Sequence, residues 1–366
     1  MKYYIIAGEA SGDLHASNLV REIRKADRNA RVRGWGGDLM AAAGTEVVKH
    51  YRELAFMGFI EVAKNLPTIL KNIRFCKEDI TAFHPDILVL VDYPGFNLRI
   101  AEWAKEEGYK IVYYISPQVW AWKEKRVMLI RKVVDKMLVI LPFETDFYKK
   151  WDYKVVYVGH PLVQVVNDFL SNHPREEQAK PVIALLPGSR KQEVAKKLPL
   201  MLEVSKAFPD YQFVVAKAPS LDDEFYNSFL QKYPEVHTVL NETYSLLTKA
   251  SAALVTSGTA TLETALFGVP EVVCYKGSSV SYQIARRLIR IRYISLVNLI
   301  MDKEVVTELI QNELTVPNMI RELDRVLHDP KKKAQLSEDY KALRALLQQG
   351  GNASERAAEE VVEMCQ

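Results

Sequence analysis

The sequence has few cysteines, and they follow no pattern. Its 366 residues include three, Cys76, Cys274 and Cys365, whose odd number and wide spacing argue against a disulfide framework and a zinc site. No run reaches the roughly 18 consecutive apolar residues of a membrane-spanning helix. The first residues enter a strand-like run without the charged, apolar and cleavage regions of a signal peptide. We therefore expect a cytoplasmic protein in a reducing compartment.

An excess of either charge is also missing. The chain has 49 Lys and Arg against 46 Asp and Glu, and a net charge of +3 does not by itself imply a nucleic-acid partner. No short-period repeat or low-complexity tract is present, which excludes solenoid folds. The 48% hydrophobic content is that of an ordinary globular protein. The length exceeds the size at which a single core usually stops growing, so two domains are expected.

Short β-rich runs alternate with helical patterns along most of the chain. Several runs are continuously apolar, which is typical of strands covered on both faces in a parallel sheet. The polar stretch "SNHPREEQAKP" at 171–181 interrupts the alternation, which then restarts. The predicted strands are 2–8, 30–37, 86–95, 110–116, 136–141, 154–160, 182–188, 211–219, 237–241, 252–258, 271–277 and 293–300.

This alternation predicts two doubly wound α/β domains in tandem, each with a parallel sheet. We expect the domains at 1–170 and 182–316, a linker at 171–181, and helices over 317–366. Ligands of such sheets bind beyond the carboxyl ends of the strands, and tandem domains are expected to line a common crevice. The loops that directly follow each strand are therefore the candidate binding loops.

Two loops of the second half suit a diphosphate. In "LLPGSRKQEV" Pro187 and Gly188 form the turn, and Arg190 is suited to a bidentate anion contact. The alternative is a helix N-cap, for which Ser189 is the candidate, with a solvated arginine. In "TSGTATLETALFGVP" small residues allow backbone N–H groups to approach a diphosphate closely. Glu263 follows one turn later and is a candidate ribose ligand, with a capping box as the alternative. The small residues are Ser257, Gly258, Thr259 and Ala260.

The first half offers carboxylates instead. "GEASGD" at 8–13 follows the first predicted strand but lacks the lysine of a Walker loop and the G-x-G-x-x-G spacing of a dinucleotide fingerprint. It supplies Glu9, Ser11 and Asp13. Asp92 of "VDYPGFN" lies at the end of another apolar strand, where a carboxylate is costly to bury unless it is paired or has a function. The alternative for Asp92 is a cap of the following turn.

Two further segments combine aromatic or apolar residues with cations. "ISPQVWAWKEKRVMLIRK" at 115–132 has Trp120 beside Lys123 and Arg126, a combination suited to an anionic, amphiphilic substrate. The segment 54–77 resembles a surface that enters an anionic leaflet without crossing it, with an amphipathic core helix as the alternative. Its apolar members are Phe56, Met57, Phe59, Ile60, Leu66, Ile69 and Leu70. A second basic stretch, 282–296, is suited to either a membrane or a nucleotide.

With these loops identified, the chain resembles the lipid A disaccharide synthase family nearly from end to end. A single one of its motifs is weak, but the series in order is specific. The motifs are "GEASGD", "LAFMGFIEV", "DYPGFN", "SPQVWAWKEKR", "LPFE", "GHP", "LLPGSR", "SGTATLE" and "SLVNL". The resemblance implies an inverting glycosyltransferase of the GT-B type, with two Rossmann-like domains and without a metal or organic cofactor.

The resemblance also implies a reaction and roles. The sugar of UDP-2,3-diacylglucosamine is transferred to the 6-hydroxyl of 2,3-diacylglucosamine 1-phosphate, which gives UDP and a β-1,6 disaccharide on the route to lipid A. Asp92 is implied as the general base and Glu9 as the second acidic candidate, while Arg190, Asn298 and Gln311 correspond to UDP-site residues. A protein attached peripherally to the inner membrane is implied, and a dimer with exchanged C-terminal segments is the alternative to a tail that packs on its own first domain.

Two other functions fit parts of this pattern. A UDP-N-acetylglucosamine 2-epimerase of the same fold would need no lipid surface. A non-catalytic UDP-sugar-binding protein at the membrane would bind UDP but would have no use for Asp92.

Overall fold

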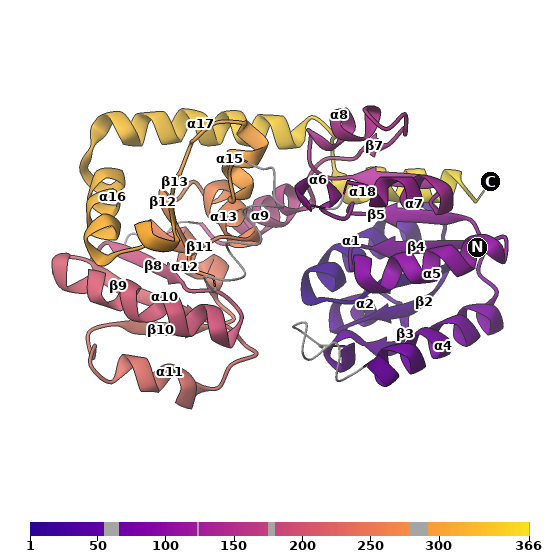
Figure 1. Ribbon diagram of the computed structural model, residues 1–366, viewed down its shortest axis with the longest axis horizontal. Coiled ribbons are helices and arrows are strands. Elements are labelled where there is room, and N and C mark those ends of the chain that lie inside the picture. The colour runs from indigo at the N-terminus through magenta and orange to yellow at the C-terminus, as the bar shows by residue number, and fades with distance from the viewer. Residues whose placement is uncertain (55–65, 123, 175–179, 278–291, 366) are drawn as a thin grey trace. The chain divides into compact units, whose positions relative to one another are not determined.

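The computed structural model describes residues 1–54, 66–122, 124–174, 180–277 and 292–365. These residues form two compact units, one of Met1–Pro161 with Leu347–Gln366 and one of Leu162–Leu346. Each unit has its own parallel β-sheet flanked by helices (Figure 1). The α/β class predicted from the sequence, with two doubly wound parallel sheets, is confirmed.

The sheet of the first unit has the strand order β3-β2-β1-β4-β5-β6-β7. Ala7 pairs with Val91, so the carboxyl ends of β1 and β4 lie side by side. From this pair the chain proceeds outward in opposite directions, which makes it the switch point at which open α/β sheets bind ligands. The strands are β1 (Lys2–Ala7), β2 (Arg31–Gly36), β3 (Glu46–His50), β4 (Ile87–Val91), β5 (Ile111–Tyr114), β6 (Lys136–Val139) and β7 (Val156–Tyr157).

The core of the first unit is built from the apolar runs of these strands. All five side chains of β4 are buried, as expected for a strand covered on both faces. Trp35 of β2 is fully buried, and its ring centroid lies 5.0 Å from that of Phe96. The helices are α1 (Ala10–Ala26), α2 (Asp38–Ala42), α4 (Leu66–Phe83), α5 (Pro94–Glu106), α6 (Val119–Trp122), α7 (Arg126–Val133), α8 (Glu144–Lys149) and α18 (Ala353–Glu363).

Helix α18, near the C-terminus, packs against α1 of the same unit. Its buried residues Ala353, Ala357, Ala358 and Val361 recur at the spacing of one helix face, and their small side chains allow close packing. At the outer side of this helix, Lys136 Nζ lies 2.7 Å from the Glu360 carboxylate. In this structure the end of the chain therefore completes the unit in which the chain begins.

The sheet of the second unit has the order β10-β9-β8-β11-β12-β13, so its switch point lies between β8 and β11. Val255 of β11 pairs with Leu186 at the end of β8. The strands are β8 (Val182–Leu186), β9 (Gln212–Lys217), β10 (His237–Leu240), β11 (Ala250–Thr256), β12 (Glu271–Tyr275) and β13 (Thr307–Ile310). The helices are α9 (Pro161–Asn172), α10 (Lys191–Val204), α11 (Asp223–Leu230), α12 (Thr243–Lys249), α13 (Thr259–Leu266), α15 (Leu296–Met301), α16 (Val316–His328) and α17 (Pro330–Gln348).

The boundary between the units differs from the expected one at 171–181. The first unit ends at Pro161, and α9 belongs to the second unit. Phe169 of α9 packs there against Tyr244 and Phe267, with ring centroids 5.4 and 6.0 Å away. The change in composition after position 170 marks the end of α9, whereas the chain passes between units one helix earlier.

Two expected elements at the sheet edges also differ. The apolar run 293–300, predicted as a strand, contains helix α15, because the Ser295 hydroxyl caps the helix by accepting a hydrogen bond from Asn298 N–H. The last strand is β13 instead. Strand β3 was not predicted either, because its half-buried sequence EVVKH has no continuous apolar run.

Candidate active site

Two carboxylates meet at the switch point of the first sheet. Asp92 directly follows β4, and Glu9 follows β1 after Gly8, so the pairing of β1 with β4 brings them to the same edge. Burial, and next the negative charge of Glu9, raise the pKa of Asp92 to about 7. Tyr93, and not Asp92, is the N-cap residue of α5, and a hydrogen bond from the Tyr93 backbone has a smaller, opposite effect that lowers the pKa of Asp92.

The first glycine of "GEASGD", Gly8, allows the turn after β4 to lie close to the turn after β1. The ring of Tyr93 lies directly against Gly8, and any Cβ at that position would overlap it. Glu9 is exposed, and it is the N-cap residue of α1, although its side chain makes no capping hydrogen bond. In the position where other folds have a phosphate-binding loop, this motif forms a turn that places the Glu9 carboxylate at the N-terminus of α1. The helix dipole favours negative charge there.

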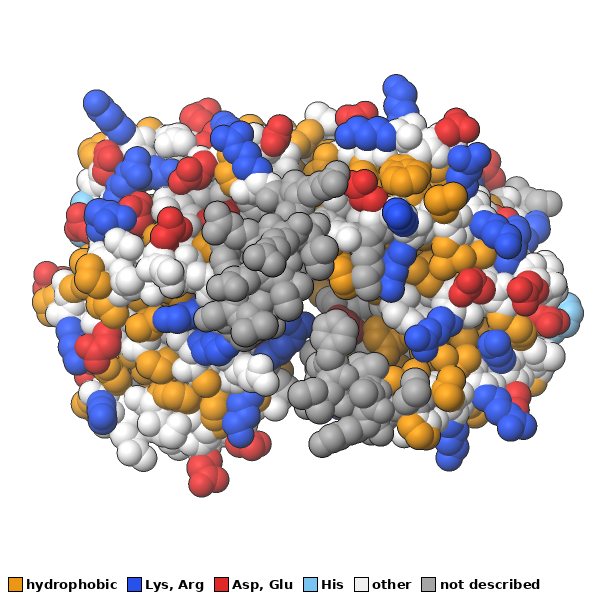
Figure 2. All heavy atoms as spheres, viewed as in Figure 1, with side chains coloured by type: hydrophobic (Ala, Val, Ile, Leu, Met, Phe, Trp, Pro, Cys, Tyr) orange, Lys and Arg blue, Asp and Glu red, His pale blue; other side chains and the backbone are white. Residues whose placement is uncertain are grey.

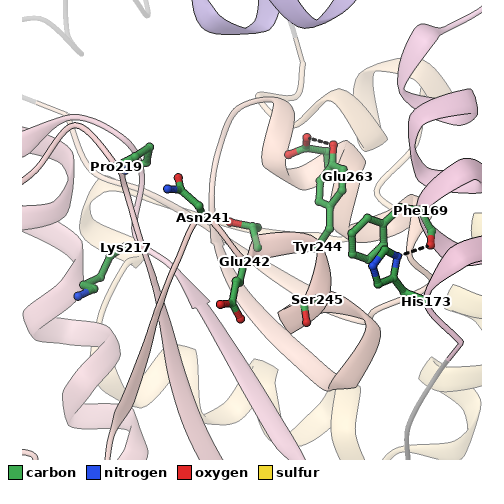
Figure 3. A pocket seen from close by; sticks show the side chains of 10 residues that line it. Phe169, His173, Lys217, Pro219, Asn241, Glu242, Tyr244, Ser245 and Glu263 are labelled. Carbon is green, nitrogen blue, oxygen red and sulfur yellow. Dashed lines mark hydrogen bonds between the residues drawn. The ribbon is translucent and has the colours of Figure 1, made fainter. Parts of the chain in front are cut away.

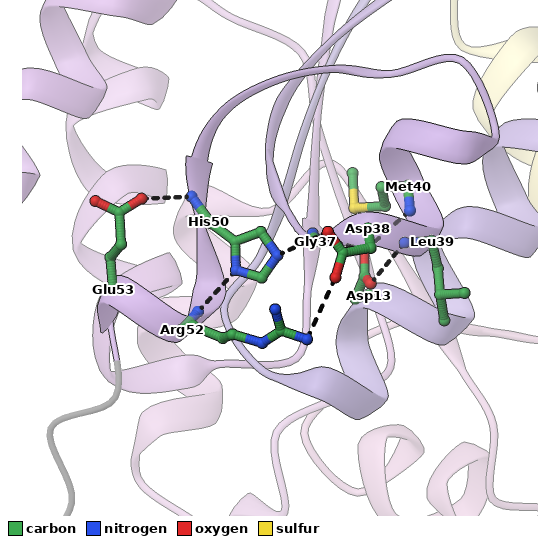
Figure 4. Close-up of polar contacts among 8 residues, drawn as sticks. All are labelled: Asp13, Gly37, Asp38, Leu39, Met40, His50, Arg52 and Glu53. Carbon is green, nitrogen blue, oxygen red and sulfur yellow. Dashed lines mark hydrogen bonds and ion pairs between the residues drawn. The ribbon is translucent and has the colours of Figure 1, made fainter. Parts of the chain in front are cut away.

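The second carboxylate of the motif has a structural role (Figure 4). Asp13 is 2% exposed, and its two oxygens accept hydrogen bonds from the backbone N–H groups of Gly37, Leu39 and Met40 at 2.7 to 3.1 Å. These are donors at the start of α2, where a helix lacks intrahelical acceptors. The carboxylate of Asp13 is thus occupied by backbone donors, and its expected contact with the acceptor substrate stays a prediction. Ser11 is exposed in the first turn of α1.

Next to α2, Figure 4 also shows a polar cluster, in which His50 is half-buried. Asp38 lies 3.3 Å from Arg52 Nη2 and 3.5 Å from His50 Nε2, and Glu53 accepts a hydrogen bond from the His50 N–H. These contacts tie the end of β3 to α2.

Trp120 of the expected acceptor segment is hydrogen-bonded to the buried Glu144. Its indole Nε1–H donates to Glu144 Oε1 at 3.2 Å, and its ring meets Phe143 edge-on at 4.9 Å. Glu144 is 1% exposed, and burial raises its pKa to about 7. Trp122 in the same helix is 51% exposed. Glu144 belongs to the "LPFE" motif, but nothing in its local sequence signals burial, so it was not chosen as a site residue.

Of the remaining two expected acceptor-site residues, Arg126 is described by the structure and Lys123 is not. Arg126 is half-buried at the start of α7. Lys123 lies outside the described residues.

In the second unit the two predicted diphosphate loops come together at the switch point. Gly188, at the end of β8, lies beside Thr256 at the end of β11. Arg190 is largely exposed, and its Nη1 donates to Glu193 Oε1 at 3.2 Å. Arg190 itself is the N-cap residue of α10, with no side-chain cap from the exposed Ser189, so the capping alternative for Ser189 does not hold.

Helix α13 begins at the second of these loops. Its N-cap is Gly258, and a Cβ there would meet nothing within 4 Å among the described residues, so these leave the space in front of this backbone open. Thr259 and Ala260 form the first turn. The Ser257 hydroxyl donates to the Ile294 carbonyl at 2.9 Å and so is bound to a neighbouring loop.

Glu263 faces a cavity of about 570 Å³ in the second unit. Tyr244 Oη–H donates to Glu263 Oε1 at 2.7 Å, so the capping-box alternative for this glutamate is wrong (Figure 3). Burial raises the pKa of Glu263. The cavity lies at the carboxyl edge of the sheet, which is where such folds bind ligands. Its lining residues are Phe169, His173, Lys217, Pro219, Asn241, Glu242, Thr243, Tyr244, Ser245 and Glu263.

Asn298, expected to contact UDP, is hydrogen-bonded within the second unit, and its contact with UDP stays a prediction. It is fully buried, its Oδ1 accepts from the N–H groups of Val305 and Val306, and its Nδ2 donates to the Val306 carbonyl and to Glu308 Oε1. All these bonds lie between 2.8 and 3.0 Å. The side chain therefore fixes the path from α15 to β13.

Gln311 follows β13 at the carboxyl edge, in a left-handed conformation with φ of +53°. It is half-buried. A Cβ at Gly277 would lie 3.6 Å from Gln311 Nε2, so this side chain reaches the end of the neighbouring strand β12.

The expected lipid segment is described only from α4 onward. Phe56, Met57, Phe59, Ile60 and the side chain of Leu66 lie outside the described residues, as do 282–291 of the second basic stretch. Ile69 is half-buried and Leu70 is 55% exposed. In Figure 2, basic and acidic side chains are intermixed over much of the face shown.

The described ranges lack two kinds of feature. No helix there is long and apolar enough to cross a membrane. The same ranges contain no cluster of three or more His, Cys, Asp or Glu side chains arranged to hold a metal ion.

Solved structures with similar folds define the class. The crystal structure of UDP-GlcNAc 2-epimerase from Neisseria meningitidis bound to UDP-GlcNAc matches 99% of this chain and 100% of its own, with a TM-score of 0.70 and 14% identity. The glycosyltransferase of kitacinnamycin matches 99% of this chain and 98% of its own, with a TM-score of 0.67 and 13% identity. The fold is the GT-B fold of nucleotide-sugar glycosyltransferases and epimerases.

Sequence comparison identifies the family. The family model described as Lipid-A-disaccharide synthetase matches residues 3–363. Lipid-A-disaccharide synthase of Geobacter metallireducens is 40% identical over 98% of this chain and 96% of its own, and that of Syntrophus aciditrophicus is 40% identical over 97% and 95%. The chain belongs to the lipid-A-disaccharide synthase family, as its motifs predicted, and is a glycosyltransferase.

Proposed function

We propose that the protein transfers 2,3-diacylglucosamine from its UDP derivative to the 6-hydroxyl of 2,3-diacylglucosamine 1-phosphate, with inversion at the anomeric carbon. The products are UDP and the β-1,6-linked disaccharide 1-phosphate. The observation that carries the mechanism is the pair formed by Asp92 and Glu9 at the switch point of the first sheet.

Asp92 is the proposed general base. A sugar hydroxyl is a poor nucleophile, so its proton must be removed as its oxygen forms the new bond to the anomeric carbon and the bond to the UDP oxygen breaks. A base is most effective when its pKa lies near the working pH, and burial together with the charge of Glu9 brings the pKa of Asp92 to about 7. Glu9 thus acts on the base through its charge and remains the second acidic candidate.

The UDP group of the donor is assigned to the second unit. The open backbone at Gly258 and the first turn of α13 offer N–H donors to the diphosphate, and Arg190 offers a cation for the charge that develops on the departing UDP. Glu193, which now holds Arg190, has to release it to the phosphate. The cavity beside Glu263 has the size of a ligand pocket, and we assign the uridine to it with the ribose at Glu263.

Acylated substrates also require a surface in contact with lipid. On α4, Leu70 and Phe75 are 55% and 41% exposed, with the exposed cations Lys71 and Arg74 between them. This arrangement supports a peripheral attachment of the cytoplasmic protein to the inner membrane. A dimer that exchanges C-terminal segments stays a prediction, because α18 packs here on α1 of its own chain.

The deciding experiment is an assay with both diacylated sugars on wild type, Asp92→Asn and Arg190→Ala, with UDP affinity measured by calorimetry. Loss of the base is expected to lower kcat by about 10²–10⁴-fold while UDP affinity is kept. Loss of the arginine is expected to weaken UDP binding as well as turnover. Full activity of Asp92→Asn would contradict the proposed mechanism, and epimerisation of UDP-N-acetylglucosamine without a lipid would favour the epimerase alternative.

A further inference from the structure

The backbone at Asp92 and Tyr93 has an unusual conformation. Both residues are in the left-handed region, with φ of +45° and +49°, although neither is glycine. Tyr93 also precedes Pro94, and a residue before proline favours an extended backbone. Two consecutive residues of this kind persist only where neighbouring groups hold them, and such turns cluster at functional sites.

The groups that hold this turn are identifiable. Asn97, fully buried in α5, donates from Nδ2 to the Asp92 carbonyl at 2.7 Å, and its own backbone N–H donates to the Tyr93 carbonyl at 3.0 Å. Tyr113, fully buried in β5, donates from Oη to the same Asp92 carbonyl at 2.6 Å. The Asp92 carbonyl therefore accepts hydrogen bonds from two buried side chains, one in the following helix and one in the neighbouring strand.

Asn97 also links the strands that carry the two carboxylates. The same Nδ2 lies 3.2 Å from the Val91 carbonyl of β4 and 3.5 Å from the Ile6 carbonyl of β1. Glu9 follows β1 and Asp92 follows β4, so one buried amide bridges the two strand ends that lead to them. None of these contacts involves the Asp92 carboxylate, which stays available to a substrate.

We propose that Asn97 and Tyr113 are positioning residues, which lock the left-handed turn through the Asp92 carbonyl and thereby fix the Asp92 carboxylate beside Glu9. The inference rests on the proposed role of Asp92 as the base. If the turn relaxes, the carboxylate gains solvent and its basicity falls. The charged and titratable groups near it are Glu9 from the β1–α1 turn, Tyr93 in the turn itself and Tyr113 in β5, and Arg126 at the start of α7 acts on Tyr113.

The test uses Tyr113→Phe, which removes one hydroxyl and keeps the ring in the core. Steady-state kinetics with both diacylated sugars are measured from pH 5 to 9, and UDP affinity is measured by calorimetry. We expect kcat to fall about tenfold or more, with donor KM and UDP affinity unchanged and with the acidic limb of the rate profile at lower pH. A role confined to stability would lower the thermal midpoint but would leave the limb in place, and that result would overturn the proposal.

A matched control and a second variant sharpen this test. Tyr114→Phe removes the hydroxyl of the next residue in β5, whose side chain points to the opposite face of the sheet, and is expected to behave as wild type. Asn97→Asp keeps the size of the side chain but loses the Nδ2 donor, and the same loss of kcat and shift of the limb are expected. Should it fail to fold, Tyr113→Phe alone decides.

Asp92→Asn, measured in parallel, separates the two ideas. Full activity of Asp92→Asn means that the base is assigned wrongly. An inactive Asp92→Asn together with wild-type kcat and pH dependence in Tyr113→Phe means that only the positioning proposal fails.

Discussion

At the scale of single residues, the environment of Asp92 sets both its chemistry and its cost. A carboxyl group whose pKa rises on folding is destabilised in its charged form, first by burial and second by the charge of Glu9. The fold accepts this cost because a base with a pKa near 7 is effective at physiological pH. The buried position of Asp92 therefore lowers the stability of the folded protein and at the same time gives the side chain the basicity that catalysis needs.

We predict that Asp92→Asn stabilises the folded protein in a pH-dependent way. Between about pH 4 and 7 the folded protein holds a proton at this site that the unfolded chain has released, so the contribution of Asp92 to stability falls as pH rises through this range. In urea denaturation, the variant is expected to exceed wild type in unfolding free energy at pH 8 and to approach it at pH 4. Glu106→Gln, at an exposed site, is the control, and an equal gain at both pH values would contradict the explanation.

A second residue-scale prediction concerns Asp13. Its replacement by alanine leaves the N–H groups of Gly37, Leu39 and Met40 without their acceptor, two of these bonds being buried. We expect a loss of unfolding free energy of roughly 3 kcal/mol, the scale of buried polar groups left unpaired. Ser11→Ala, at an exposed position in the same turn of α1, is expected to change stability by less than about 0.5 kcal/mol. A loss of activity without a loss of stability would instead return Asp13 to the substrate site.

At the scale of elements, α4 has two different faces. Cys76 and Ile80 are fully buried, whereas Leu70 and Phe75 are exposed next to Lys71 and Arg74. A helix that serves only the core has no need of large apolar side chains on its outer face. The described part of the segment therefore packs one face in the core. Phe75 also contacts the buried Trp35, with ring centroids 6.1 Å apart, and contact of the exposed side chains with a membrane stays a prediction.

We predict that the double substitution Leu70→Ser with Phe75→Ser weakens binding to vesicles that contain anionic lipid. The loss of exposed apolar area is expected to lower the bound fraction in a sedimentation assay by about tenfold. The thermal midpoint is measured alongside, because the Phe75 ring also packs against Trp35, and the single variant Leu70→Ser avoids that contact. Met128→Ser, at a residue 67% exposed on α7, is the control. If both variants bind as wild type does, α4 is not the contact surface.

At the scale of the whole molecule, the two units carry different parts of the proposed reaction. The first unit has the paired carboxylates, and the second has the open helix start, the arginine and the cavity beside Glu263. Each set lies at the switch point or carboxyl edge of its own sheet, so the same topological rule is used twice.

This division predicts which backbone segments become protected from hydrogen exchange when UDP binds without the acceptor. Hydrogen exchange measured with and without UDP is expected to slow at 187–190 and 256–263, with little change at 8–13 and 91–97. Glu263→Gln is expected to weaken UDP binding about tenfold, equivalent to about 1.4 kcal/mol. Glu242→Gln serves as a second probe of the cavity wall. Protection confined to the first unit would contradict the assignment of the nucleotide.

The sequence by itself determined the class of fold, the position of most strands, the family and the loops that follow the strands. These depend on local patterns: continuous apolar runs mark buried strands, and the spacing of motifs survives in the linear chain. It also selected Asp92 and Glu9, whose proximity the structure shows and whose roles stay predictions. It failed at β3, at β13 and at α15, where apolar runs were short or suited two structures.

Only the tertiary structure decided how the polar side chains are used. Asp13 and Asn298 resemble site residues in the sequence, yet Asp13 binds backbone groups at α2, and Asn298 binds the backbone just before β13. Glu144, Tyr113 and Asn97 were not selected, because burial and hydrogen-bond partners arise only when distant segments meet. The type of a polar residue determines which bonds it can make, but the fold determines its partners. For this reason the sequence located the candidate site, whereas the structure distinguished the polar groups that are bonded within the fold from those that stay open to a ligand.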